Sequence, residues 1–252
     1  LGMAHTRWAT HGGVTEANCH PHTDDAAGIC LIHNGIIENY AALRTWLKER
    51  GHTFNSETDT EVLAVLIGEL YEGDLEAAVQ AALKEVTGAY AIAVMCEKEP
   101  DVLVCARKGS PLLIGVGSGE YVVASDASAI VAHTTQAFAL DDYNVCKLTR
   151  DGIQTSTIDN KAVTPKMMQL EMDLDQIELG GGVSELFALL RADALSSTEA
   201  RDPEAGRAYE RALEHPATTL PGAVALLSTP FEHATDEQRA AAEEILADAQ
   251  AH

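Results

Sequence analysis

The sequence predicts an α+β fold in which antiparallel sheets pack against helices. Three segments with apolar residues at helical spacing lie between residues 38 and 86, and short β-branched segments separated by Gly, Pro and Asp turns follow from Ala89. Helices and strands are therefore grouped along the chain rather than alternating, which favours antiparallel pairing over βαβ units. With 252 residues and 46% hydrophobic side chains, the chain can bury a full core.

The first predicted strand is GICLIHNGII, residues 28–37, whose Asn34-Gly35 pair predicts that it ends in a tight turn. A helix over residues 38–51 follows and stops at a glycine cap. A second helix, over residues 56–73, starts with a Ser or Thr cap and acidic residues in its first turn. A third helix covers residues 75–86. The predicted strands that come next are AYAIAVMC (89–96), DVLVCARKG (101–109), LLIGVG (112–117), YVVASD (121–126) and NVCKLT (144–149).

Composition changes after the glycine triplet at residues 180–182, which predicts a domain over residues 1–182 and a separate segment over residues 183–252. The second segment contains no lysine, is rich in Ala, Glu and Asp, and is interrupted by prolines. We expect it to be all-helical and made of several short helices. The pattern is clearest in SELFALLRADAL (184–195), EAGRAYERALEH (204–215) and TDEQRAAAEEILADAQAH (235–252).

Charge and composition exclude several classes of protein. A net charge of -22, from 39 acidic and 17 basic side chains, repels phosphate backbones and predicts no nucleic-acid partner. No apolar segment approaches the ~20 residues that cross a bilayer, and the opening residues LGMAHTRWAT lack the features of a signal peptide, so a cytoplasmic location without membrane contact is expected. The five cysteines are odd in number and widely spaced, which predicts free thiols, mostly in the core; they are Cys19, Cys30, Cys96, Cys105 and Cys146.

Polar residues near the start of the chain are candidates for a binding loop. Arg7, Trp8, Thr10 and His11 lie close together and are followed by two glycines. An arginine can hold a carboxylate through two parallel hydrogen bonds, and a neighbouring tryptophan can close over the bound group. The structural alternative is an arginine in an ion pair beside a core tryptophan, and spacing alone does not separate the two interpretations.

Two further positions extend this hypothesis. Asn34-Gly35 is usually just a turn, but a side-chain amide beside a backbone N–H can also form an oxyanion hole. Asp59 lies among acidic residues that favour a helix N-terminus, and a solvent-facing aspartate could equally bind an ammonium group. Together these pieces match an amino acid: Arg7 for its carboxylate, Asp59 for its ammonium, and Asn34 with Gly35 for a carbonyl that becomes tetrahedral.

The segment Cys19-His20-Pro21-His22 raises a zinc hypothesis, because Cys and His are good zinc ligands. The spacing argues against it, since adjacent Cys and His rarely bind one ion and the other histidines nearby form no recognised ligand pair. The interpretation that we retain is loop histidines with satisfied hydrogen bonds, and neither a metal nor a cofactor is predicted.

Four segments in combination carry a family resemblance: HTRWATHG (5–12), the N-C-H-P-H stretch (18–22), HNGIIENY (33–40) and SETDTE (56–61). They resemble the glutaminase domain, a class II amidotransferase domain, of the glutamine–fructose-6-phosphate aminotransferases. Further similarity at Gly88-Ala89-Tyr90, at residues 106–117 and at residues 124–126 extends the resemblance from Gly2 to about Gly182. It implies an N-terminal-nucleophile fold, a four-layer αββα sandwich with two antiparallel sheets between helices.

The resemblance also implies roles for individual residues. Arg7 would bind the carboxylate of L-glutamine and Asp59 its amino group, while Asn34 and Gly35 would hold the oxyanion. The remaining residues would close over the site or line it; they are Trp8, Thr10, His11 and His20.

In that family an N-terminal cysteine attacks the glutamine amide and its own α-amino group acts as the base. This sequence begins with Leu1 and its cysteines are internal, so we expect the chain as given to hydrolyse no glutamine. Residues 172–182 resemble the family's acidic linker, and the resemblance stops after Val183. Fructose 6-phosphate would be a partner only together with the sugar-isomerase lobes, and the resemblance also implies a homodimer.

Two functional hypotheses follow. In the first, the chain is the amide-transfer part of an aminotransferase that supplies ammonia from glutamine for glucosamine 6-phosphate synthesis. In the second, it is a catalytically inactive glutamine-binding or scaffold protein whose C-terminal helices contact partners. Intact ligand loops beside an absent nucleophile support the second hypothesis.

Overall fold

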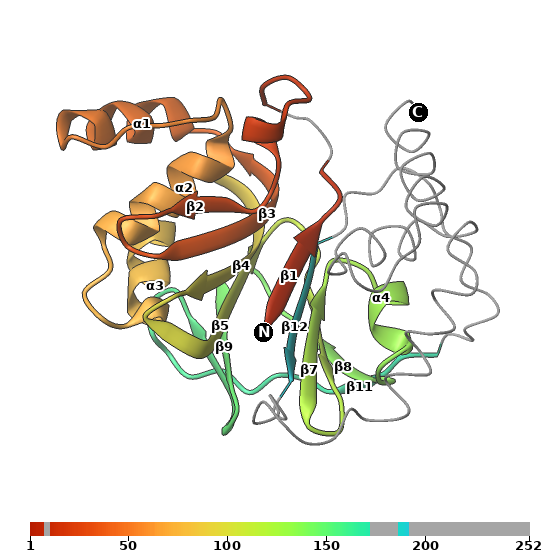
Figure 1. Cartoon of the computed structure of the whole chain (residues 1–252). Coiled ribbons are helices and arrows are strands. Elements are labelled where there is room, and N and C mark those ends of the chain that lie inside the picture. Colours follow the sequence, from red (N-terminus) through yellow and green to blue (C-terminus); the bar gives the residue numbers. More distant parts are fainter. Residues whose placement is uncertain (8–10, 172–185, 192–252) are drawn as a thin grey trace, which may run out of the picture. The chain divides into compact units, whose positions relative to one another are not determined.

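Two antiparallel sheets dominate the computed structural model, which describes residues 1–7, 11–171 and 186–191 (Figure 1). Within these residues each sheet has six strands. The first sheet has the order β10 (Gly152–Thr157), β9 (Asn144–Thr149), β5 (Glu99–Lys108), β4 (Gly88–Cys96), β3 (Ile29–Ile37) and β2 (His22–Asp24). The second sheet has the order β1 (Gly2–His5), β12 (Leu186–Arg191), β7 (Glu120–Ala124), β6 (Leu113–Val116), β8 (Gln136–Ala139) and β11 (Met168–Gln169).

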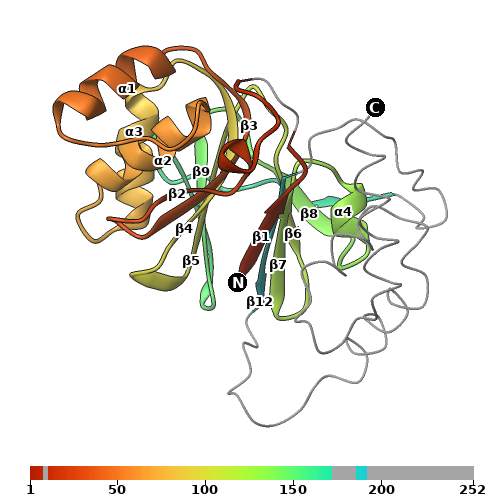
Figure 2. The same cartoon turned by 45° about the horizontal axis from the view of Figure 1, so that its top comes forward.

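The helices of the first eighty-five residues gather on the outer face of the first sheet (Figure 2). They are α1 (Tyr40–Glu49), α2 (Asp59–Glu69) and α3 (Leu75–Glu85), preceded by the 3-10 turn η1 (Glu16–Asn18). Helices α2 and α3 each begin at a side-chain cap, because Thr58 accepts from the N–H of Glu61 and Asp74 accepts from that of Ala77. On the second sheet lies the short helix α4 (Ser128–Val131).

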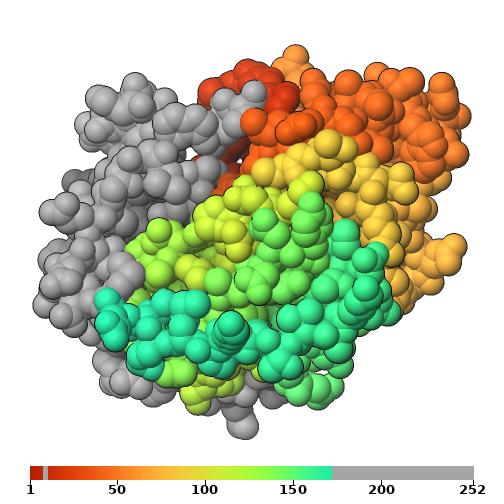
Figure 3. Space-filling model, turned by 180° about the vertical axis from the view of Figure 1, so that it is seen from behind, coloured from red at the N-terminus to blue at the C-terminus, as the bar shows by residue number. Residues whose placement is uncertain are grey.

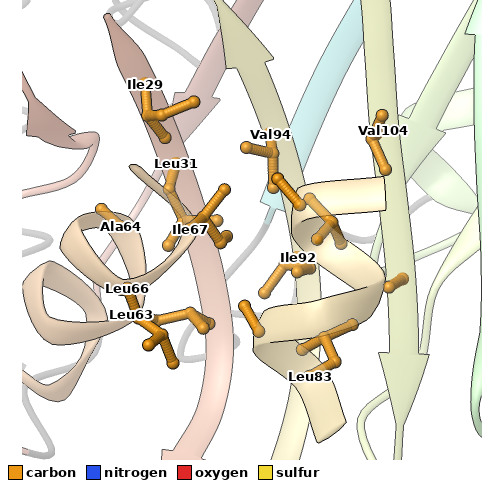
Figure 4. Packing of buried hydrophobic residues seen from close by; sticks show 14 of the residues in the cluster. Ile29, Leu31, Leu63, Ala64, Leu66, Ile67, Leu83, Ile92, Val94 and Val104 are labelled. Atoms are coloured by element: carbon orange, nitrogen blue, oxygen red, sulfur yellow. The ribbon is translucent and has the colours of Figure 1, made fainter. Parts of the chain in front are cut away.

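Three apolar layers hold these elements together. The outer layer packs β3 and β4 against α2 and α3, as Ile29, Leu31, Ile67 and Leu83 illustrate (Figure 4). The inner layer joins the two sheets. Its members include Ile32, Ala93, Leu103, Cys105, Ile114, Val123, Phe138 and Cys146, all of them fully buried. A smaller cluster seals α4 against the second sheet. The order helix, sheet, sheet, helix confirms the predicted α+β fold and its αββα layering.

Helix α2 is more deeply enclosed than its sequence pattern suggests. Residues Asp59 through Ile67 are all buried, because β2 and β3 cover one side of the helix and α1 and α3 contact it elsewhere. Gly68 allows this packing: a Cβ there would lie 1.8 Å from Oδ2 of Asp24 and 3.0 Å from Cβ of Ala27. The first turn of α2 is buried and lies next to the C-terminal end of β3, where Asp59 bonds to Ile37.

Most local predictions are confirmed. The three predicted helices correspond to α1, α2 and α3, and the five strands predicted between residues 89 and 149 correspond to β4, β5, β6, β7 and β9. The five cysteines are free thiols, and three of them are buried: Cys96, Cys105 and Cys146. None of the described helices is long and apolar enough to cross a bilayer.

One correction concerns Asn34-Gly35, which does not form a turn. Strand β3 continues through both residues to Ile37, and they pair with Ala91 and Tyr90 of β4. Gly35 adopts a φ of 128°, and a Cβ there would lie 2.2 Å from the carbonyl oxygen of Ala89. The glycine is thus explained by the close approach of β4 rather than by a hairpin.

A second correction concerns the segment SELFALLRADAL. Its residues Leu186–Arg191 form β12, not the predicted helix. The reason is tertiary, because β12 pairs with β1 on one side and with β7 on the other, satisfying backbone groups that both strands would otherwise leave unpaired. The other predicted helices at residues 204–215 and 235–252, the acidic linker and the domain boundary at residues 182–183 all lie outside the described residues.

Candidate active site

Segments from both sheets meet where β1 ends. Strand β1 contacts β3, although the two belong to different sheets, and α2 contacts β3 from the helical layer. The chain leaving β1 at His5 enters the loop of Arg7 and His11, while β3 carries Asn34 and Gly35. Asp59 begins α2. The fold therefore brings together segments that are up to 54 positions apart, from His5 to Asp59.

Asn34 is held by a hydrogen bond from the other sheet. Nε2 of His5 lies 2.7 Å from Oδ1 of Asn34. Asn34 and Gly35 are both partly exposed, whereas Leu31, Ile32 and His33 before them in the strand are buried. This end of β3 thus presents a carboxamide and a backbone without a side chain to the surface, the two components of the predicted oxyanion hole.

Arg7 organises the loop that follows it. Its Nη2 donates to the carbonyl oxygens of His11, at 2.7 Å, and Gly12, at 3.5 Å, and its Nη1 donates to that of Gly13, at 3.0 Å. Among the described residues, no carboxylate lies within ion-pair distance of Arg7. The structural ion pair considered for Arg7 is therefore not found there, and its guanidinium stabilises a curved loop instead. The predicted site residues Trp8 and Thr10 lie outside the described residues.

Asp59 connects three of the segments. It is only 2% exposed, and its Oδ2 accepts a 2.8 Å hydrogen bond from the backbone N–H of Ile37. Its Oδ1 lies 3.7 Å from Nδ1 of His11, whose ring packs edge-on against Tyr40. The carboxylate is thus inside the protein and does not face the solvent as the sequence hypothesis supposed. It retains one oxygen directed toward the Arg7 loop.

A row of histidines supports the site. The ring centroid of His20 lies 4.0 Å from that of His5, and Nε2 of His20 lies 3.2 Å from Oγ1 of Thr60. The same hydroxyl lies 3.1 Å from Nδ1 of His33, and Thr58 contacts His22 at 3.0 Å. Burial lowers the pKa of His5 to about 4, and burial also lowers the pKa values of His20, His22 and His33. At neutral pH these four rings are uncharged hydrogen-bonding groups.

Comparison with known families identifies the family to which these segments belong. Residues 1–172 match the family model described as a glutamine amidotransferase domain. The chain belongs to this family. The confirmed family is the one to which the four sequence segments pointed.

Curated relatives similar to this chain are named glutamine–fructose-6-phosphate aminotransferase (isomerizing). The chain is 52% identical to the one from Xanthomonas campestris over 182 residues, 48% to that from Chlorobaculum tepidum over 185, and 46% to that from Symbiobacterium thermophilum over 181. These matches cover 71–72% of the chain but only 30% of each relative. The amidotransferase domain thus corresponds to about 30% of the length of these relatives.

Solved structures agree on the fold. The glutamine phosphoribosylpyrophosphate amidotransferase of B. subtilis has a TM-score of 0.52 and 27% identity, covering 62% of this chain and 34% of its own. The structure described as the allosteric regulatory enzyme of purine biosynthesis has a TM-score of 0.51 and 28% identity, covering 58% of this chain and 32% of its own. Both structures share the fold of this domain, and the first is itself named an amidotransferase.

Several residues that hold this domain's loops together were not singled out by the sequence. Glu61 is buried, and its carboxylate accepts from the N–H of Asn55, the N–H of Ser56 and the hydroxyl of Ser56 at 2.6–2.8 Å. Asn18 joins two loops, because it accepts from the N–H of Glu57 at 2.9 Å and donates to the carbonyl of Gly13 at 3.0 Å. The motif NCHPH contains Asn18, but nothing in its spacing indicates these partners.

The amidotransferase domain also has a cavity of about 510 Å³ that includes none of the predicted site residues. It is lined by Glu76, Phe138, residues 153–156 and residues 160–167 except Lys161 and Lys166. Figure 3 shows the blue-green end of the described chain, which contributes most of this lining, running across the lower part of the face seen from behind. Apolar and neutral polar groups dominate the lining. The charged groups that could bind the carboxylate and ammonium of an amino acid, Arg7 and Asp59, lie instead near the ends of β1 and β3, here called the β1–β3 end.

Proposed function

We propose that the chain binds L-glutamine at the β1–β3 end and stabilises the oxyanion that forms when the side-chain amide is attacked. Arg7 binds the α-carboxylate, Oδ1 of Asp59 receives the α-ammonium group, and Asn34 with Gly35 surrounds the amide oxygen. His11 and His20 support the site, and Trp8 and Thr10 belong to the loop that borders it. None of these residues is assigned the attack on the amide carbon.

The observation that carries this proposal is that His11 links a cation, Arg7, to an anion, Asp59, whose carboxylate bonds to the strand of the partly exposed Asn34. Arg7 contacts the backbone of His11, the ring of His11 approaches Asp59, and Asp59 bonds to β3 three residues after Asn34. An α-amino acid has a carboxylate and an ammonium group on one carbon, so a cation and an anion on the same loop system suit it. Toward the described residues, the hydrogen bonds of Arg7 use three of its five N–H donors.

For the larger protein we propose the reaction in the relatives' name. The amide nitrogen of glutamine would be transferred to fructose 6-phosphate, which gives glucosamine 6-phosphate. Identity of 46–52% across the amidotransferase domain supports this acceptor. Whether the protein is a homodimer, as the resemblance implies, stays a prediction.

Calorimetry on the chain tests the binding site with two ligands. L-Glutamine should bind saturably, and L-glutaminamide, in which a neutral carboxamide replaces the α-carboxylate, should bind more weakly. The Arg7→Ala variant should lose about 2 kcal/mol of glutamine binding, roughly a 30-fold increase in Kd, because a desolvated ion pair is broken. The same variant should bind L-glutaminamide about as well as the unmodified chain does.

The ligand pair separates recognition from loop stability, since Arg7 also holds three carbonyl oxygens of its own loop. A variant that weakens both ligands equally would assign Arg7 to the loop alone. Arg50→Ala is the matched control, because Arg50 is exposed on the far end of α1 and covers the Trp46 ring at 3.5 Å. No saturable heat with L-glutamine at millimolar concentration would refute the proposed site.

A further inference from the structure

We infer that His5 is a positioning residue of the oxyanion hole: it fixes the carboxamide of Asn34 so that Nδ2, not Oδ1, faces the amide oxygen of the ligand. This inference rests on the proposed function for its ligand. The geometric evidence for it is the hydrogen bond that joins the two sheets, in which Nε2 of His5 lies 2.7 Å from Oδ1 of Asn34.

The register of β3 decides which way Asn34 points. Side chains alternate along a strand, so Asn34 shares the face of Ile32, which belongs to the core between the two sheets. His33 shares the opposite face with Leu31, which packs in the helical layer, and reaches Thr60 of α2. The Asn34 carboxamide is thus directed toward the second sheet, where β1 supplies His5.

A carboxamide has two nearly isosteric ends, and only one of them can stabilise an oxyanion. A free Asn side chain can rotate and present its oxygen, which would repel the developing negative charge. A single donor aimed at Oδ1 removes this ambiguity, because the oxygen is then engaged and the NH₂ group points away from the donor.

His5 is suited to this task because its ring is neutral and held in place. Burial lowers its pKa to about 4, so at pH 7 the imidazole has one N–H. The inference places this N–H on Nε2, which lies 2.7 Å from the carboxamide oxygen. The ring of His20 lies against it at 4.0 Å and is itself held by Thr60 at 3.2 Å. A neutral donor orients Asn34 without adding a positive charge that would attract the substrate's carboxylate to the wrong end of the site.

The first test needs no ligand. Long-range ¹H–¹⁵N spectra of the chain at pH 7 should show His5 protonated at Nε2 and unprotonated at Nδ1. The side-chain NH₂ signals of Asn34, assigned by their loss in Asn34→Ala, should shift and broaden in His5→Ala and recover in His5→Gln, which keeps an N–H donor. Protonation at Nδ1 alone, or unchanged Asn34 signals in His5→Ala, would overturn the inference.

His52→Ala is the matched control. Nε2 of His52 also bonds to a side-chain oxygen, Oε2 of Glu69 at 2.8 Å, but it lies after α1, outside the site. Removing it deletes an imidazole hydrogen bond to a side-chain oxygen elsewhere in the domain and should leave the Asn34 signals where they are.

The second test uses the ligand's own amide. L-Glutamine is compared with L-norvaline, which has the same α-carbon groups but no side-chain carbonyl. His5→Ala should weaken glutamine binding about 10-fold, the equivalent of one lost hydrogen bond, and change norvaline binding by less than about 2-fold. His5→Gln should restore the preference for glutamine, and His5→Ala should have no further effect on that preference in the Asn34→Ala background.

The results distinguish the positioning role of His5 from the proposed glutamine site. Equal weakening of both ligands by His5→Ala would mean a general structural role and would overturn the positioning role. If the unmodified chain binds neither ligand, the proposed function fails, while the Asn34 spectra still decide whether His5 orients the carboxamide.

Discussion

Charged residues in this domain either stabilise the fold or are placed to bind a ligand. Glu61 is only 5% exposed, and its carboxylate accepts hydrogen bonds from Asn55 and Ser56 in the loop just before α2. Asp59 and Arg7 also contact backbone, but each is directed toward the same loop and has further capacity for a ligand. An acidic residue in the SETDTE motif is therefore structural or ligand-directed according to its partners, not according to its type.

We predict that Glu61→Gln destabilises the fold by about 2–4 kcal/mol. The amide retains one acceptor oxygen but directs an NH₂ group at a cluster of three donors, so at least one donor, part-buried at Asn55 or buried at Ser56, loses its partner. Urea unfolding followed by tryptophan fluorescence measures the change. Glu49→Gln, at an exposed position of α1, is the control and should shift the free energy of unfolding by less than about 0.5 kcal/mol. A loss equal to the control's would contradict the structural role of Glu61.

The buried histidines predict a loss of stability in mild acid. The folded-state pKa of His5 is about 4 and its unfolded value is about 6.5, so below pH 6.5 the unfolded chain binds a proton that the folded chain does not. The contribution of His5 is therefore fully present above pH 6.5 and decreases as the pH falls from 6.5 toward 4, by up to about 1.4 kcal/mol per pH unit. Burial lowers the pKa values of His20, His22 and His33 as well, so their effects have the same sign.

His5→Gln isolates one of these contributions. Glutamine keeps a donor but does not titrate. Between pH 6.5 and 5, the slope of unfolding free energy against pH should therefore decrease by up to about 1.4 kcal/mol per pH unit, the contribution of one proton, relative to the unmodified chain. Urea titrations at several pH values give the slope. An identical slope in His5→Gln would show that His5 titrates alike in the folded and unfolded states.

Strand β3 is the element on which the site depends most. It lies between β2 and β4 in its sheet, receives α2 on one face and contacts β1 on the other, and it has a glycine where β4 comes closest. Alternation along the strand then divides its side chains between two layers. The functional carboxamide is thus placed by the strand's register, and a shift of one residue would exchange Asn34 with His33.

We predict that Gly35→Ala costs much more stability than Gly51→Ala. Both glycines have positive φ angles, 128° and 96°, so each alanine introduces backbone strain of about 1 kcal/mol or more. At Gly51 a Cβ meets nothing within 4 Å, whereas at Gly35 it would lie 2.2 Å from the carbonyl oxygen of Ala89. Gly35→Ala should therefore lose at least about 3 kcal/mol, since the β3–β4 pair must also move apart.

The comparison of these two variants separates backbone strain from lack of space. Thermal unfolding gives the stability difference, and amide exchange of β4 residues reports on the strand pair. Equal losses at the two positions would mean that β4 adjusts freely to a side chain at residue 35, and that the glycine is required only for its conformation.

At the scale of the whole molecule, sequence patterns predicted what depends on neighbours along the chain. The helices α1 to α3 and the longer strands have clear periodicity and end signals, and the family resemblance indicated the αββα layering. Asn34-Gly35 was misinterpreted because a glycine required by a neighbouring strand looks the same in sequence as a glycine required by a turn. Residues 186–191 have helical spacing, yet they form β12 because two distant strands provide hydrogen-bonding partners.

The same distinction applies to the site. Residues with a recognisable chemical type were identified as candidates, including Arg7, His11, Asn34 and Asp59. The contacts that hold them were not predicted, because the hydrogen bond from His5 to Asn34 and the one from Ile37 to Asp59 each join separate elements. Periodicity reports which face of an element is apolar, but it does not report which polar atoms meet across two layers.

Because the site joins two sheets, its geometry should depend on the core between them more than on the core beneath the helices. Leu31 and Ile32 are adjacent in β3 and equally buried, but Leu31 packs in the helical layer and Ile32 between the sheets. Truncating either to alanine should cost about 2–5 kcal/mol, measured by urea unfolding. Only Ile32→Ala should shift the side-chain NH₂ signals of Asn34, since its cavity lies on the face where β3 meets the strand of His5. Equal shifts in both variants, at matched loss of stability, would show that the position of Asn34 depends on β3 as a whole and not on how the two sheets pack.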